Sequence, residues 1–265
     1  HRDQGGQAGA RSIRLYVREL TPSGIPHGLY SRHESYPGPW CRNRANVLII
    51  YSTGMERLEE RLDREVGAYL ERVEGMDEVR ALLSGEIPKE SYVKFLKTFY
   101  VIEDISRKAV LKAADKTKYD IPYLSKRFLL CARGEEGHAE IALEDLAGMG
   151  GTGVDVSGVA EVGEYDEFLQ KAADEFPLGV LGHSYLFENA SGIMFPKNAE
   201  LPYPSKFIVV HAKEAPGHSL AIKRTVRNIE GDLTEEDGDR IVAFARESGE
   251  RLLMVFEAMG ADKSD

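Results

Sequence analysis

Residues 88–114 read PKESYVKFLKTFYVIEDISRKAVLKAA, and this stretch decides the expected fold. Its apolar residues recur every three or four positions, which is the spacing of one face of an α-helix. Pro88 suits the first turn of that helix, where a backbone N–H would have no partner in any case. Glu103 and Asp104 interrupt the apolar face, so the stretch predicts a long core helix with an acid that needs a partner. The apolar face consists of Tyr92, Phe95, Leu96, Phe99, Ile102 and Ile105.

The chain that follows residue 55 repeats this helical pattern. Leu58 and Leu62 open it, and glycines and prolines separate the later segments. Thr234 is expected to cap the last helix. We find no strand alternation and no internal repeat, so we expect an all-α domain, residues 55–265, of about seven helices. The expected helices cover residues 56–73, 77–83, 88–114, 122–149, 166–193 with a kink or restart at Pro177, 206–229 and 235–259.

Residues 1–54 differ from the rest of the chain in charge and pattern. They hold seven arginines, no lysine and three acids, with turn signals at Pro22-Ser23-Gly24 and Pro37-Gly38-Pro39 but no helical period. We expect an irregular basic extension that is dispensable for the fold, with Met55 as the natural start of the protein. The alternative is a basic arm that packs on the acidic remainder of the chain.

The composition argues against several classes of partner. The chain has a net charge of −10, with 42% hydrophobic residues, which disfavours nucleic acid and anionic membrane surfaces. No apolar run approaches the roughly 18 residues of a membrane-spanning helix. Cys41 and Cys131 provide no disulfide framework, so we expect a reducing, cytoplasmic location.

Histidines and carboxylates share faces of the expected helices. Glu135 and His138 lie three residues apart, and His211, Glu214 and His218 follow one another at i, i+3 and i+7. Helix bundles that bind two irons draw such side chains into the core from facing helices. Carboxylate and imidazole ligands without a thiolate suit iron or manganese better than structural zinc. A single Glu-x-x-His is also typical of surface ion pairs, so only the combination predicts a metal site.

Two further carboxylates interrupt apolar helical faces. Glu103 lies in the stretch quoted above, and Glu188 lies in a later helix. Each is costly to bury alone, and a metal ion would be a strong partner. We therefore expect both in the metal site, with the His138 and His211 imidazoles facing each other within about 10 Å. His183 lacks the acidic surroundings of the other late histidines, so we expect an ordinary core or surface histidine.

Residues 135–150, EEGHAEIALEDLAGMG, resemble a helix of the haem-oxygenase-like di-iron oxidases and oxygenases. In that family an acid and a histidine on this helix bind iron. A later helix carries His-x-x-x-Asp-x-x-His, whose histidines His211 and His218 match. The resemblance covers residues from about 55 to 260. It implies the haem-oxygenase-like all-α bundle, two irons that activate O₂, and substrates such as amino acids or fatty acids.

The resemblance also implies which residues hold the metal. The first iron would be held by Glu135, His138 and His211. Ala215 stands where the family has its aspartate and cannot bind a metal, so the second position should be weak and Ala215→Asp should strengthen it. A distortion at Pro216-Gly217 would aim Glu214 inward as a substitute. The remaining candidates for the second position are Glu103, Glu188, Glu214 and His218.

Other proteins of this fold bind haem or catalyse reactions with residues that this chain lacks at the corresponding places. True haem oxygenases use a histidine on the first helix, whereas no histidine precedes His138 after residue 55. Thiaminase-like members use a cysteine nucleophile on a later helix, whereas Cys131 lies on the Glu135 helix and is expected to be packed or inert. A ferritin-like carboxylate protein would need a second Glu-x-x-His, and none is present.

The sequence thus predicts a non-haem iron enzyme that uses O₂ to oxidise a small amino-acid or fatty-acid-like substrate, with one or two Fe(II) per chain. Arg107 or Lys213 could pair with a substrate carboxylate, and a plain surface charge is the alternative role for both. The alternative is a non-catalytic helical binding or interaction protein that retains a partial metal site. We expect a small molecule as partner, no nucleic acid and no membrane, and a homodimer as the assembly to consider.

Overall fold

The computed structural model describes residues 56–151, 153–195 and 201–260. The extension of residues 1–54 lies outside the described residues, so the predictions about it stay predictions. The described residues form helices joined by short connections and contain no strand, which confirms the all-α prediction. Among them, no helix has the length and apolar character needed to cross a membrane. The helices are α1 (Leu58–Glu74), α2 (Asp77–Ser84), α3 (Lys89–Thr117), α4 (Pro122–Gly134), α5 (His138–Gly148), α6 (Ala160–Glu175), α7 (Pro177–Met194), α8 (Lys206–Ile229), the short 3₁₀ helix η1 (Glu230–Asp232) and α9 (Glu235–Gly260).

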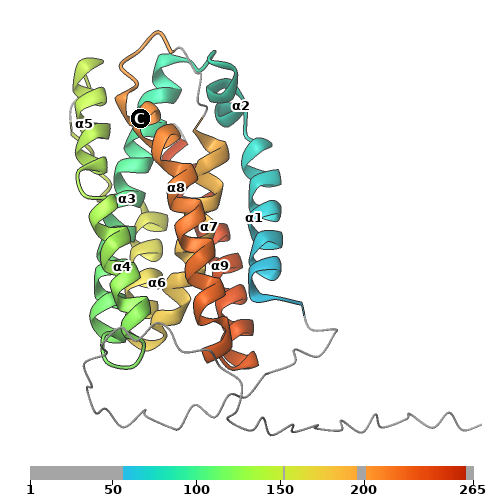
Figure 1. Ribbon diagram of the computed structural model, residues 1–265. Helices are drawn as coiled ribbons and strands as arrows, with labels where there is room; N and C mark the ends of the chain where they lie inside the picture. Colours follow the sequence, from blue (N-terminus) through green and yellow to red (C-terminus); the bar gives the residue numbers. More distant parts are fainter. Residues whose placement is uncertain (1–55, 152, 196–200, 261–265) are drawn as a thin grey trace, which may run out of the picture. The chain divides into compact units, whose positions relative to one another are not determined.

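The long helices run side by side as a bundle (Figure 1). Helix α3 packs against α4, α5, α6 and α9, while α7 packs against α1, α6, α8 and α9. These two central helices carry Glu103 and Glu188, and both side chains are buried. The bundle therefore brings two carboxylates into its interior, as the sequence predicts.

The start of α9 agrees with the sequence prediction, whereas the start of α6 differs from it. At the start of α9, the Asp237 N–H donates to Thr234 Oγ1 at 3.0 Å, and the Thr234 N–H donates to the Asp237 carboxylate at 3.1 Å. This reciprocal cap satisfies two backbone donors and confirms the predicted role of Thr234. Helix α6 begins at Ala160 rather than near residue 166, because buried Val162 and Tyr165 extend its apolar face.

The segment expected as one helix over residues 122–149 is two helices, which corrects the prediction. Gly137 has a φ of 93°, a left-handed backbone conformation that residues other than glycine rarely adopt. This conformation interrupts the helix. Helix α4 closes at Glu135, whose N–H donates to the Cys131 carbonyl at 3.0 Å. Helix α5 begins at His138. Glu135 and His138 therefore meet across a sharp turn instead of sharing one helical face.

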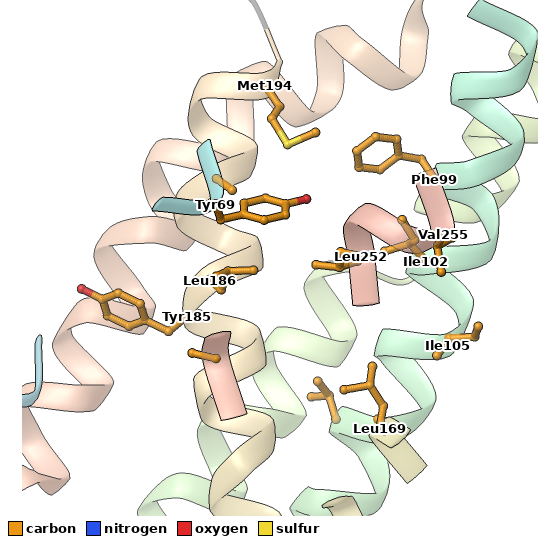
Figure 2. Packing of buried hydrophobic residues seen from close by; sticks show 14 of the residues in the cluster. Tyr69, Phe99, Ile102, Ile105, Leu169, Tyr185, Leu186, Met194, Leu252 and Val255 are labelled. Atoms are coloured by element: carbon orange, nitrogen blue, oxygen red, sulfur yellow. The ribbon is translucent and has the colours of Figure 1, made fainter. Parts of the chain in front are cut away.

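Aromatic and aliphatic side chains fill the space between α3, α7 and α9. Figure 2 shows Phe99, Ile102 and Ile105 of α3 together with Leu252 and Val255 of α9. The Phe99 ring is 1% exposed and lies at the centre of this core. Its ring contacts those of Phe95, Phe187, Phe195, Phe207 and Phe256, with centroid separations from 4.6 to 6.4 Å.

Helices α7 and α9 touch at Gly182. A Cβ atom on this glycine would lie 2.5 Å from the Ile241 carbonyl oxygen and 3.2 Å from the Ala245 nitrogen, both backbone atoms of α9. Gly182→Ala is therefore expected to lower the free energy of unfolding by about 1–3 kcal/mol, because the helices must move apart. Urea unfolding measures the loss. Gly163→Ala in α6, whose Cβ would meet nothing within 4 Å, is the control and should be neutral or stabilising; equal losses would contradict the close packing.

Candidate metal centre

Four side chains from different helices converge inside the bundle. Glu103 comes from α3, Glu135 from the end of α4, His138 from the start of α5 and His211 from α8. One potential ligand atom from each lies within 4.8 Å of those of the others. The ring centroids of His138 and His211 are 4.5 Å apart, which confirms the predicted facing arrangement. Carboxylates and imidazoles in this combination are ligands that iron and manganese accept.

The Nδ1 atom of His138 is buried and has no hydrogen-bond partner. It lies 2.6 Å from Glu135 Oε2, in a close contact between imidazole and carboxylate. The other ring nitrogen, Nε2, lies 3.3 Å from Glu214 Oε2. A buried nitrogen that faces an oxygen without a hydrogen bond calls for a physical explanation, and a shared cation is one.

The His211 ring is held in one tautomer. Its Nδ1–H donates to the Phe207 carbonyl at 2.8 Å, so the lone pair lies on Nε2, 3.1 Å from Glu103 Oε1. Burial and the neighbouring His138 lower the pKa of His211 to about 4, while burial and the nearby Glu135 raise the pKa of Glu103. A lone pair on Nε2 that faces a carboxylate oxygen at 3.1 Å requires a proton or a cation between the two atoms. A cation could take the place of that proton.

The Glu135 carboxylate faces two histidines at once. Oε2 lies 2.6 Å from His138 Nδ1, and Oε1 lies 3.0 Å from His218 Nδ1. Burial acts to raise the pKa of Glu135, but the two imidazoles outweigh it and bring the pKa down to about 2. His218 also lies 3.2 Å from Glu188 Oε2, and hydrogen bonds to the two carboxylates raise the pKa of His218 to about 11. The His218 imidazolium therefore balances part of the charge of Glu135 and Glu188.

Cys131 belongs to a second group of potential ligands that borders the first. Cys131, Glu135 and Glu188 each bring one potential ligand atom within 4.8 Å of the others, and the Cys131 thiol donates to Glu188 Oε1 at 3.3 Å. We expect this cysteine to be packed or inert, and it does pack against the hydrophobic core, with its thiol next to the candidate ligands. Its spacing of one helical turn before Glu135 is the signal that could have placed it there. Burial and the two carboxylates raise the pKa of Cys131 well above its ordinary range.

Helix α8 stays helical through Pro216, which corrects the distortion expected at Pro216-Gly217. Proline removes one backbone N–H, and the buried residues His211 and Ile222 on either side of it hold the helix against the bundle. Glu214 comes within 3.3 Å of His138 without such a distortion, although its side chain is 42% exposed.

The seven residues predicted as ligands lie in or beside this centre. Ala215, which stands at the aspartate position of the family pattern, is buried and lines the same small cavity. A carboxylate at that position would therefore line the same cavity as the candidate ligands. The cavity is lined by Glu135, His138, Phe187, Glu188, Ser191, His211, Glu214, Ala215 and His218.

Neither of the two basic residues predicted to bind a substrate carboxylate, Arg107 and Lys213, has a free position in the centre. Arg107 Nε–H donates to the Ala132 carbonyl at 3.2 Å, and Lys213 lies on the surface. Arg127 instead lines a cavity of about 80 Å³ beside the centre, and its Nε–H donates to Thr225 Oγ1 at 3.1 Å. Sequence reasoning missed Arg127 because one arginine on an amphipathic helix carries no distinguishing pattern.

His183 is a structural histidine of the core. It is 1% exposed, with Nδ1 2.6 Å from Ser248 Oγ and Nε2 3.1 Å from Ser106 Oγ. Burial lowers the pKa of His183 to about 3, so the ring is neutral at physiological pH. This confirms the prediction that His183 is an ordinary core or surface histidine.

The buried His183 should make the fold sensitive to acid. Above about pH 6.5 the ring is neutral in both the folded and the unfolded chain, and below it only the unfolded chain takes up the proton. We expect His183 to cost the folded state up to about 1.4 kcal/mol per pH unit as the pH falls from about 6.5 towards 3. Urea unfolding across this range should give a flatter pH dependence for His183→Gln. Parallel curves for the variant and the parent would refute this assignment.

No protein-family model matches the chain, and no curated protein matches it. Among solved structures, a TenA homologue from Pyrococcus furiosus matches with a TM-score of 0.65 and 15% identity, over 76% of this chain and 99% of that one. A domain of unknown function with a heme oxygenase-like fold from Shewanella denitrificans gives 0.62 and 20% identity, over 76% and 89%. A TenA homologue from P. horikoshii gives 0.58 and 17% identity, over 78% and 100%. At these identities the likeness concerns the fold alone, and the chain has the helical fold of the haem-oxygenase-like proteins.

Proposed function

We propose that this protein is a non-haem iron oxidase or oxygenase that uses O₂ on a small amino-acid or fatty-acid-like substrate. The observation that carries the proposal is the buried cluster of Glu103, Glu135, His138 and His211, in which His138 Nδ1 has no hydrogen-bond partner. An isolated buried carboxylate is unfavourable, so a cluster of two with two imidazoles requires protons or a cation. A mixed oxygen and nitrogen ligand set fits iron or manganese.

Bound iron would supply the electrons that reduce O₂. The protein's part is to bind and to orient. The Phe207 carbonyl keeps the lone pair of His211 on Nε2, turned towards Glu103. The Phe207 and Phe195 rings cover the His211 ring at 4.0 and 4.7 Å between centroids, which excludes water from that side.

The cavity beside the centre supports a small substrate with an apolar body and an anionic group. Arg127 lies on its wall and offers a guanidinium to a carboxylate, which binds such groups through paired hydrogen bonds. Glu188 and His218 line the same cavity, so a substrate held by Arg127 would extend towards the proposed metal. The apolar part of the wall consists of Leu124, Phe128, Leu130, Leu181, Ala221 and Ile222.

A cysteine-nucleophile chemistry of the thiaminase-like kind is a less suitable function. The thiolate is the reactive form of cysteine, and the raised pKa of Cys131 keeps its thiol protonated. The proposal includes a reducing, cytoplasmic setting, since Cys131 is a free thiol. A homodimer remains part of the proposal.

Anaerobic reconstitution with Fe(II) tests the function. We expect one or two irons per chain after desalting, and O₂ consumption that rises when amino acids or fatty acids are screened as substrates. Arg127→Gln should raise the KM for the active substrate and leave the bound iron unchanged. Iron binding without O₂ consumption for any substrate would favour the alternative, a non-catalytic binding protein with a partial metal site. Absence of bound iron would refute the metal centre itself.

A further inference from the structure

We propose that Cys131 is a thiolate ligand of a second cation position, which it forms with Glu188, His218 and the second oxygen of Glu135. This inference deepens the proposed function, on which it rests through the shared Glu135. Cations that accept sulfur, nitrogen and oxygen together, such as Fe²⁺ and Zn²⁺, fit this set, whereas Mg²⁺ and Ca²⁺ prefer oxygen alone.

The members of this group lie close to the two carboxylates, Glu135 and Glu188. The Cys131 Sγ lies 3.3 Å from Glu188 Oε1, and His218 Nδ1 lies 3.2 Å from Glu188 Oε2 and 3.0 Å from Glu135 Oε1. Cys131, Glu135 and Glu188 each contribute an atom to a set no wider than 4.8 Å. The two carboxylates thus connect the Cys131 thiol on one side with the His218 imidazole on the other.

Glu135 connects the second position to the first. Its Oε2 faces His138, a member of the first group, while its Oε1 faces His218. A carboxylate that presents one oxygen to each of two positions can bridge two ions, and paired catalytic metals lie about 3.5–4 Å apart. The orientation of Glu135 therefore suits two cations rather than one.

An unpartnered hydroxyl gives independent support for a bound group here. Ser184 Oγ is buried, with its residue 4% exposed, and has no hydrogen-bond partner. Ser184 lines two cavities, and Cys131 and Glu188 line both of them with it. A water on the cation would give this hydroxyl a partner that the protein itself does not supply.

Cys131 would replace the anion missing at Ala215. Ala215 offers no carboxylate to the cavity that Glu188 and His218 share with it. As the bonds to the cation form, the Cys131 thiol and the His218 imidazolium each lose one proton to solvent, since both groups bind a metal only in their deprotonated forms. The thiolate on α4 then supplies one negative charge to the proposed cation, whereas Ala215 on α8 supplies none.

Titration with Co²⁺ under anaerobic conditions tests the proposal, because thiolate ligands give cobalt a charge-transfer absorption that oxygen and nitrogen ligands do not. The full chain is expected to bind two Co²⁺, with the sulfur absorption present at saturation. Cys131→Ser is expected to bind one ion and lose this absorption. Cys41→Ser, which removes the only other cysteine of the chain, is the control and should behave like the parent.

The outcomes separate this proposal from the proposed function. One bound ion without the sulfur absorption in the parent would overturn the second position and leave the first intact. An absorption that persists in Cys131→Ser would assign the sulfur to Cys41 and also overturn the proposal. No bound cobalt in any variant would overturn both. As a second measurement, Zn²⁺ should slow alkylation of Cys131 in the Cys41→Ser variant by at least about tenfold; an unchanged rate would count against the thiolate ligand.

Discussion

His138→Ala is expected to abolish iron binding at the first position, with a loss of affinity greater than about 100-fold. The imidazole supplies a buried nitrogen that has no other partner, 2.6 Å from Glu135 Oε2. Alanine removes this ligand and leaves Glu103 and Glu135 with only His211 in the group. The measurement is iron per chain after anaerobic reconstitution and desalting, on protein shown to be helical by circular dichroism.

His183→Gln is the matched control for this experiment. It also removes a buried imidazole, but one whose two nitrogens are engaged by Ser248 and Ser106. The control should retain the iron content of the parent at neutral pH. Unchanged iron in His138→Ala would show that the ligand assignment is wrong, and equal losses in both variants would point to a general loss of structure.

Phe99→Ala should lower the free energy of unfolding by about 3–5 kcal/mol, which is the usual range for removing a fully buried phenylalanine. The ring is 1% exposed, and its neighbours come from α3, α7, α8 and α9. Its loss leaves a cavity that side chains from so many helices cannot close together. Urea unfolding, followed by far-ultraviolet circular dichroism, measures the change.

Tyr119→Ala provides the comparison for Phe99→Ala. Tyr119 is also aromatic and lies just beyond the end of α3, but it is 81% exposed. Its removal should change the free energy of unfolding by no more than about 0.5 kcal/mol. A small loss for Phe99→Ala, similar to that of the control, would mean that the aromatic core is not the main source of stability.

The helical fold could be predicted because, over long segments, the residues that recur at helical spacing are also the buried ones. In α3, the residues at helical spacing from Tyr92 to Ile105 are also buried ones, so the pattern reports the core directly. The division of the expected 122–149 helix could not be predicted in the same way. A glycine is tolerated within a helix, and only the backbone conformation of Gly137 shows that this one breaks it.

The acidic residues of the candidate site could be predicted from the sequence, but the residues that lie beside them could not. Glu103 and Glu188 could be identified because an acid on an apolar face needs a partner. Cys131 is apolar enough to fit an ordinary helix core, so its type alone does not distinguish a ligand from a packing residue. Arg127 stands out only because it lines a cavity. That cavity lies between helices that are far apart in the sequence, so the local sequence pattern does not reveal it.

The turn between α4 and α5 has a consequence for how an ion would leave. Glu135 closes one helix and His138 opens the next, so the two candidate ligands are joined through a turn at Gly137 rather than by a continuous helix. Helix α5 is short, and local unfolding of a short helix requires less free energy than unfolding of the whole bundle. The release rate of the ion should therefore follow the opening of α5. Amide hydrogen exchange along residues 138–148 would slow when the ion binds, while exchange in α3 would change little.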